Sequence, residues 1–276
     1  MFDRVVVVDW SASAAPSPVR PSADAIWIGV AEAGGEDTRY CRTRAAAEAA
    51  IAGLVAAGRV LVGFDFPFGY PAGFAARLTG RARAAAVWDW LAQRIEDGPD
   101  NRNNRFAVAA SVNRVFGGAG PFWGCPAGVD LPGLRAVKAV DYAALGLAER
   151  RGVERLVPRA QPVWKLYTTG SVGSQSLMGL PVVHRLAQAG AAVWPFDPAP
   201  ARVVLAEVYP SLLAQAVARE GGIKDEVQVR LLARALWRLA QDGGLAALWD
   251  VPQGVAHSEE GWILGAGQAG VLEAAL

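Results

Sequence analysis

Several features that define common protein classes are missing from this sequence. Among its 276 residues only two are cysteines and two are histidines, and none of them has a partner at a metal-ligand spacing. This scarcity excludes a disulfide-stapled scaffold and a zinc motif of the cysteine–histidine type. The formal net charge of +1 creates no overall field that would attract nucleic acid or an anionic membrane. A nucleic-acid ligand would therefore need a local basic patch.

Long apolar runs and targeting patterns are also missing. No uninterrupted apolar stretch approaches the roughly 20 residues of a membrane-spanning helix, and no signal pattern precedes the first apolar run. With 53% hydrophobic and 19% charged residues, the composition is that of a globular protein with a sizeable core. We therefore expect a cytoplasmic protein without a membrane partner. Its length suits a single domain over 1–276 that carries an insertion.

Two valine-rich apolar runs each end in an aspartate. The first covers Val5–Val8 and is followed by Asp9, and the second covers Val60–Phe64 and is followed by Asp65. Uncharged runs of this length are typical of strands buried in the middle of a sheet. A third run, "VVLAEVYP", places Glu207 in a similar position. Because open α/β sheets bind ligands at the carboxyl ends of their strands, these acids are predicted to share a site.

The segments around these runs predict an α/β order. Strands over 24–32 and 38–43 and an alanine-rich helix over 44–57 precede the strand that ends at Asp65. The later expected elements are a helix over 181–190, strands over 191–197 and 201–210, a helix from Ser211, a helix over 224–244 and a partly buried extended tail over 256–266.

The stretch 66–179 differs in character, because Pro, Gly, Asn, Arg and Trp dominate it. It is too long for an ordinary loop, so we expect an insertion or cap with a helix over 81–97 and helices near 134–152. The tryptophans in loop-like contexts, Trp10 and Trp164 among them, have two interpretations. They could pack beneath long connections, or they could stack on a base or sugar.

Carboxylates on separate elements are typical of phosphoryl hydrolysis that depends on Mg²⁺ or Mn²⁺. Asp9, Asp65 and Glu207, together with Asp225 at the start of a predicted helix, could supply the ligands. Each also has a simple structural interpretation, as a turn residue or as a first-turn helix residue. As a set, the four are predicted to be both the catalytic and the metal-binding residues.

The order of elements and acids resembles the ribonuclease H-like fold. More narrowly, "VVVVDWSAS", "VGFDFPFGYP", "AEVYPSLL" and "KDEVQVRLLARAL" together resemble a family of unknown function in the ribonuclease H-like superfamily, whose members are described as predicted nucleases. The resemblance spans most of the chain and is weakest in the insertion. It implies an α/β fold, with a mixed sheet flanked by helices and a large helical or irregular insertion after the fourth strand. It also implicates Asp9, Asp65, Glu207 and Asp225 as the family's acidic positions.

One position departs from that family's pattern. The last motif of the family has a second acid one helical turn after the first, where this sequence has Gln228. Residues three apart share a helix face, so an acid there would point with Asp225 at the metal. A neutral amide is a weak Mg²⁺ ligand, and the neighbouring Glu226 points to a different face. The departure predicts a one-metal site, weaker catalysis or no catalysis.

Two further stretches could bind phosphate. "KLYTTGSVGSQS" opens a helix, so its backbone N–H groups could face an anion, although it does not match the phosphate-loop pattern and could instead be a tight loop at the helix start. "DNRNNRFAV" is basic and rich in amides, but it could equally be a solvated loop. The candidate phosphate- or substrate-binding residues are Lys165, Thr169, Ser171, Ser174, Lys224 and Arg105.

The leading hypothesis is a metal-dependent phosphodiester hydrolase that acts on nucleic acid or a nucleotide through activated water, without a covalent intermediate. An actin-like phosphotransferase or ATPase is one alternative, since its first strand also ends in an Asp before a small-residue turn such as "DWSAS". A ligand-binding module that has lost part of the metal site is another, and Gln228 supports it.

Overall fold

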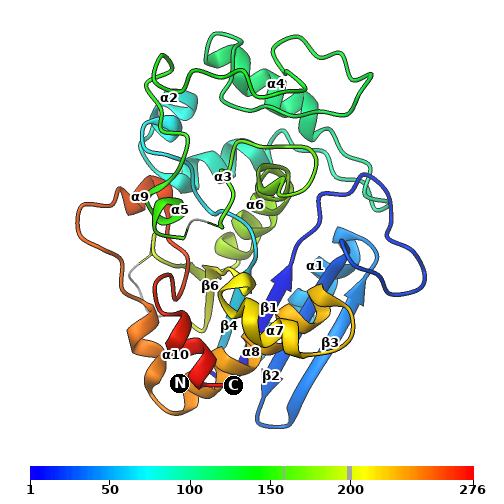
Figure 1. The fold of residues 1–276 in the computed structure, drawn as a ribbon, viewed down its shortest axis with the longest axis vertical. Helices are drawn as coiled ribbons and strands as arrows, with labels where there is room; N and C mark the ends of the chain where they lie inside the picture. The colour runs from blue at the N-terminus through cyan, green and yellow to red at the C-terminus, as the bar shows by residue number, and fades with distance from the viewer. Residues whose placement is uncertain (158, 198–200) are drawn as a thin grey trace.

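The computed structural model describes residues 1–157, 159–197 and 201–276. These residues form a six-stranded sheet in the order β3-β2-β1-β4-β6-β5 (Figure 1). Its strands are β1 Arg4–Asp9, β2 Ile26–Glu32, β3 Gly35–Cys41, β4 Val60–Phe64, β5 Ala192–Val193 and β6 Val203–Glu207. β1, β2 and β3 pair antiparallel, whereas β1, β4, β6 and β5 run parallel. This mixed α/β sheet confirms the predicted fold class, and its order is compatible with the ribonuclease H-like fold.

Helices cover both faces of this sheet, and helices separated by longer irregular segments build the insertion. The α-helices are α1 Arg44–Leu54, α2 Phe74–Thr79, α3 Ala84–Ala92, α4 Arg105–Val115, α5 Gly152–Leu156, α6 Val172–Gln188, α7 Ala214–Arg219, α8 Lys224–Gln241, α9 His257–Glu260 and α10 Ala269–Ala274. Two 3₁₀ helices, η1 Pro210–Leu213 and η2 Gly244–Leu248, flank α7 and α8. Within the described ranges, no helix combines the length and the apolarity that crossing a membrane requires.

Strand alternation divides the core into two layers. Because successive side chains of a strand point to opposite faces, Val5 and Val7 of β1 pack toward α8, whereas Val6 and Val8 pack toward α1 and α6. On the α8 side, Gly29 of β2 lets the helix approach closely. A Cβ at Gly29 would lie 2.4 Å from the carbonyl oxygen of Val229. The start of α8 is therefore held against the middle of the sheet.

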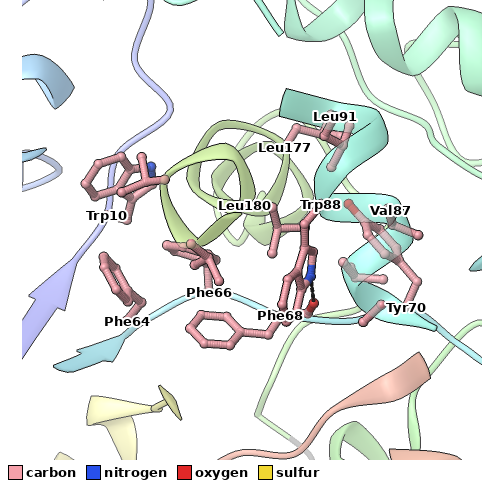
Figure 2. Close-up of a cluster of buried hydrophobic side chains, with 14 of the residues drawn as sticks. Trp10, Phe64, Phe66, Phe68, Tyr70, Val87, Trp88, Leu91, Leu177 and Leu180 are labelled. Carbon is pink, nitrogen blue, oxygen red and sulfur yellow. Dashed lines mark hydrogen bonds between the residues drawn. The ribbon is translucent and has the colours of Figure 1, made fainter. Parts of the chain in front are cut away.

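An aromatic cluster joins the insertion to the other face of the sheet. Figure 2 shows Phe64, Phe66 and Phe68, which extend from the end of β4 and alternate with smaller or polar residues, packed against Trp10 and the α3 residue Trp88. The indole N–H of Trp88 donates to the carbonyl of Phe68 at 2.7 Å. The helices α2, α3 and α4 consequently lie beyond the carboxyl ends of the parallel strands (Figure 1).

Two expectations about local structure were wrong. No helix forms over 134–152, where the chain makes turns and bends that include Gly146 at a φ of +65°. Its buried residues Leu134, Tyr142 and Leu147 enter the aromatic core separately, whereas Val137 is 70% exposed, so they do not form one helical face. The tail over 256–266 was expected to be extended, but it contains the short helix α9 before an isolated bridge from Ile263 to β6.

Candidate functional site

Asp9 and Asp65 lie side by side at the carboxyl ends of two adjacent parallel strands. Val8 of β1 is in register with Phe64 of β4, and the backbone N–H of Asp65 donates to the carbonyl of Val8 at 2.9 Å. By strand alternation both aspartates project toward the face that α8 covers. Asp9 and Asp65 are therefore neighbours at this sheet edge, as the sequence predicted.

Asp225 reaches the same region from the first turn of α8. Its Oδ2 accepts a hydrogen bond of 2.8 Å from the backbone N–H of Asp24 in the segment before β2. Asp24 has a φ of +58°, a left-handed conformation that aspartate tolerates better than most residues. A carboxylate in the first turn is also favoured by the helix dipole. Oδ1 has no hydrogen-bond partner among the described residues.

Burial and neighbouring carboxylates shift the pKa values of Asp9 and Asp65. Burial raises the pKa of Asp9 well above its ordinary value, and the charges of Asp65, Asp225 and Asp24 raise it further. Burial, followed by the charges of Glu207 and Asp225, raises the pKa of Asp65 to about 7. The ammonium of Lys224 lowers the pKa of both groups but does not offset these effects. Asp9 and Asp65 therefore hold their protons to a higher pH than a free aspartate does, and a nearby cation would favour their ionised forms.

Glu207 differs from the other predicted ligands. It is in register with Phe64, so its side chain projects to the sheet face opposite Asp9 and Asp65. Its Oε1 and Oε2 accept hydrogen bonds of 2.6 and 2.8 Å from the two terminal nitrogens of Arg151, and Oε2 also accepts one from the backbone N–H of Phe68 at 3.0 Å. With 2% of its surface exposed, Glu207 is half of a buried ion pair. Glu207 is therefore not a free metal ligand, contrary to the sequence prediction.

Arg151 is the centre of a buried network that the sequence analysis missed. It also donates to Glu154 Oε1 at 2.8 Å and to the carbonyl of Glu260 at 2.8 Å. The carboxylate of Glu260 in turn accepts from the backbone N–H groups of Ala72 and Gly152. This network fixes the segment that follows Asp65. In the sequence, only the adjacent acids Glu259 and Glu260 indicated a buried polar network here, and they did not identify Arg151 as the partner.

The donor set suits a hard divalent cation. Asp9, Asp65 and Asp225 offer only carboxylate oxygens, which Mg²⁺ and Mn²⁺ prefer. A cavity of about 30 Å³ lies beside Asp65 on the side of Arg151 and Glu207, and its lining includes neither Asp9 nor Asp225. Across the described ranges, no three His, Cys, Asp or Glu side chains already surround one point at ligand distances.

Gln228 lies one turn after Asp225 and has partners of its own. Its Nε2 donates weakly to the Ser211 hydroxyl at 3.4 Å, and the side chain is buried. Glu226, which faces elsewhere on the helix as expected, accepts a hydrogen bond of 3.0 Å from the Thr38 hydroxyl. Neither residue replaces the acid that the family pattern has at this position.

The loop before α6 is closed mostly by its own contacts. Lys165 Nζ donates to the carbonyl of Thr169 at 2.6 Å, and Thr169 itself is exposed. Ser171 is the N-cap residue of α6, but its hydroxyl makes no capping hydrogen bond. Gly173 is required here, since a Cβ would lie 2.2 Å from the carbonyl oxygen of Val163. These contacts support the tight-loop interpretation, and they leave Thr169 and Ser171 accessible.

Arg105 and Ser174 meet at the first turn of α6. The Arg105 Nε donates to Ser174 Oγ at 3.1 Å, and this hydroxyl donates to the carbonyl of Leu166 at 2.6 Å. Arg105 is only 9% exposed, and within the described ranges no carboxylate lies within 4.0 Å of it. Burial and the neighbouring charge of Arg44 lower its pKa to about 10. A buried cation at the positive end of a helix favours an anionic ligand.

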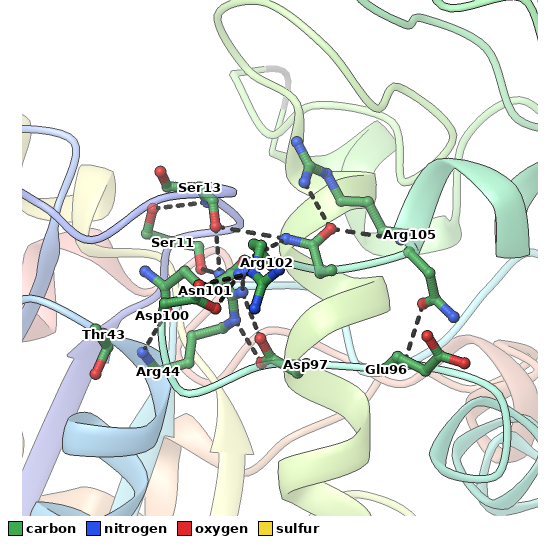
Figure 3. Close-up of polar contacts among 12 residues, drawn as sticks. Ser11, Ser13, Thr43, Arg44, Glu96, Asp97, Asp100, Asn101, Arg102 and Arg105 are labelled. Atoms are coloured by element: carbon green, nitrogen blue, oxygen red, sulfur yellow. Dashed lines mark hydrogen bonds and ion pairs between the residues drawn. The ribbon is translucent and has the colours of Figure 1, made fainter.

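Arg44 holds the turn that follows Asp9. Figure 3 shows its guanidinium between Asp97 and the turn, and it donates to the carbonyls of Ser11 and Ser13 at 3.1 and 2.7 Å. Two hydrogen bonds of 2.6 Å connect it to the carboxylate of Asp97, and Arg44 is 2% exposed. The expected helix start at this residue was correct, but its role in shaping the turn was not visible in the sequence.

Trp10 and Trp164 are fully buried in the aromatic core, which favours the packing interpretation for these two tryptophans. Comparisons with models of protein families, with curated proteins and with solved structures found no match to this chain.

Proposed function

We propose that this protein is a metal-dependent phosphodiester hydrolase that acts on nucleic acid or a nucleotide. The observation that carries the proposal is the approach of three partly buried aspartates, with Asp9 and Asp65 at the carboxyl ends of adjacent parallel strands and Asp225 in the first turn of α8. The resemblance to a ribonuclease H-like family of predicted nucleases agrees with it. Glu207, which pairs with Arg151, is assigned a supporting position beside Asp65 instead of a ligand position.

The three aspartates would hold Mg²⁺ or Mn²⁺. When bound, such an ion stabilises negative charge on a phosphoryl group and makes water a better nucleophile. Asp9 and Asp65 would contribute carboxylates from the sheet edge, and Asp225 would contribute one from α8. Lys224, directly before Asp225, adds a positive charge that suits a substrate phosphate. Arg151 keeps the segment after Asp65 in place through Glu207 and Glu260.

A second positive region is available for the substrate backbone. Arg105 and Ser174 lie at the start of α6, and Lys165 lies in the preceding loop. Gln175 of the same helix turn donates its side-chain N–H to the carbonyl of Trp10, directly after Asp9. That contact brings the start of α6 close to the end of β1. We assign this region to a phosphate beyond the cleaved bond.

The test is cleavage of single- and double-stranded DNA and RNA, with nucleotide substrates alongside, in Mg²⁺ or Mn²⁺. We expect activity that EDTA removes and that Asp9→Asn and Asp65→Asn each reduce to background. Asp37→Asn, on the exposed strand β3, is the matched control and should keep full activity. Activity of Asp9→Asn equal to that of the control would refute the mechanism.

A non-catalytic binding module is the second candidate. Two observations favour it. Glu207 already forms an ion pair with Arg151, and Gln228 occupies the position of a potential acidic ligand. Calorimetry with Mg²⁺ and Mn²⁺ separates the two candidates. Heat of binding that Asp9→Asn and Asp65→Asn abolish supports the hydrolase, whereas no binding near millimolar metal supports the module.

A further inference from the structure

A cavity of about 380 Å³ lies between η1, α7 and the start of α8. Its polar lining consists of Arg159, Tyr209, Ser211, Glu220, Lys224 and Gln228, and apolar side chains of α7 and α8 form the remainder. The volume falls within the range of small-molecule sites, about 300–1,000 Å³.

The cavity adjoins the aspartate site. Lys224 directly precedes Asp225, and Gln228 lies one turn further along the same helix. Tyr209 borders this cavity and also the small cavity beside Asp65. A ligand in the larger cavity would therefore have one end near the three aspartates.

The lining suits an anion attached to a ring with hydrogen-bonding edges. Arg159 and Lys224 supply positive charge, while Glu220 is partly neutralised by Arg230 at 2.9 Å. Tyr209 offers an aromatic face for stacking. The Gln228 amide can donate and accept at once, and its bond to Ser211 is long enough, at 3.4 Å, to be exchanged for a ligand.

We propose that this cavity binds one nucleotide unit, with its phosphate toward Lys224 and Arg159 and its base toward Gln228 and Ser211. The assignment rests on the proposed function, because it makes the cavity the subsite beside the cleaved phosphate. It also gives Gln228 a role in substrate recognition. A carboxylate at that position would repel the phosphate and could not donate to a base.

The experiment titrates the four common nucleoside 5′-monophosphates into the full chain by calorimetry, with EDTA present so that metal is not required. We expect binding by the wild type and at least about tenfold weaker binding, equivalent to 1.4 kcal/mol, for Gln228→Ala. Gln228→Glu should lose binding altogether. Gln253→Ala, at an exposed glutamine that does not line this cavity, is the matched control. Thermal unfolding checks that each variant is folded.

Three outcomes would overturn the subsite: no nucleotide binding by the wild type up to about 10 mM, equal binding by Gln228→Ala, or inorganic phosphate binding as tightly as the nucleotides. The proposed function fails separately. Asp9→Asn should lose cleavage and keep nucleotide binding, so cleavage without nucleotide binding rejects only the subsite, and nucleotide binding without cleavage rejects only the hydrolase.

Discussion

The guanidinium of Arg151 binds both carboxylate oxygens of Glu207, at 2.8 and 2.6 Å, in a part of the core where each side chain is almost completely buried. Removing one partner of such a pair leaves the other as an unpaired buried charge. Arg151→Met should therefore lower the free energy of unfolding by about 3–5 kcal/mol. Urea denaturation measures the change. The double variant Arg151→Met/Glu207→Leu should recover only part of this loss, because Glu154, the second buried carboxylate paired with Arg151, still lacks its partner.

The exposed pair Arg102–Asp100 is the control for that prediction. Its side chains are 84% and 45% exposed, so Arg102→Ala should cost no more than about 1 kcal/mol. If Arg151→Met were as mild as Arg102→Ala, the buried pair would not have the structural role assigned to it.

The raised pKa of Asp65 predicts a pH-dependent stability. The unfolded chain releases this proton near the ordinary value of 3.8, whereas the folded protein keeps it up to about 7. The folded state binds more protons in that window, so Asp65 should make the free energy of unfolding fall as pH rises from about 4 to 7, and Asp9, whose pKa is also raised, should add to this fall. Asp65→Asn should flatten this slope in EDTA-containing buffer, measured by urea denaturation at each pH.

The control for the pH series is Asp37→Asn, which should retain the wild-type slope because Asp37 is 61% exposed in its ion pair with Arg39. Added Mg²⁺ should raise the stability of the wild type mainly above pH 7, where Asp65 is ionised and able to bind a cation. An identical slope in Asp65→Asn and the wild type would contradict the assigned cause.

The sequence was sufficient to predict the positions of Asp9, Asp65 and Asp225. Valine-rich runs identify buried strands, and the periodic apolar residues of α8 place an acid in its first turn. These are local signals, each contained in one element. The convergence of Asp9 and Asp65 follows from a general property of parallel strands, whose carboxyl ends lie at the same sheet edge.

The orientation of Glu207 and the role of Arg151 required the structure. Which face Glu207 occupies depends on its register with Phe64, and a shift of one residue would have turned it toward Asp9. Arg151 lies in an irregular segment without periodicity, and its partner is 56 positions away. Arg44 pairs with Asp97 across a similar interval. Long-range pairs between loops leave no local pattern in a sequence.

The close contact between β2 and α8 makes Gly29 a sensitive position. A methyl group there would meet the carbonyl oxygen of Val229 at 2.4 Å, and this backbone atom cannot rotate away. Gly29→Ala should displace α8 and lower the free energy of unfolding by about 1–3 kcal/mol, as overpacking does. Since α8 carries Asp225, cleavage should fall as well. Denaturation and activity assays on the same preparation measure both effects.

Gly53→Ala is the control for Gly29→Ala. Gly53 lies within α1, and an added Cβ would have no atom within 4 Å. This change should stabilise the protein by about 0.5–1 kcal/mol, because alanine loses less backbone entropy than glycine in a helix. Equal effects of the two substitutions would show that the contact with Val229 is not tight.

Arg105 is predicted to affect ligand binding more than folding. It is a buried cation beside the first turn of α6, with Ser174 and Asn103 as neutral hydrogen-bond partners. Arg105→Gln removes the charge and can keep part of the hydrogen bonding, so the melting temperature should be unchanged or higher. Affinity for single-stranded nucleic acid should fall. The slope of log affinity against log salt concentration should become shallower by about one unit, as expected when one phosphate contact is lost.

Arg59→Gln is the control for Arg105→Gln. Arg59 lies at the amino-terminal edge of β4, and its replacement should leave that slope unchanged. If both variants showed the same slope, Arg105 would not contact a phosphate of the nucleic acid.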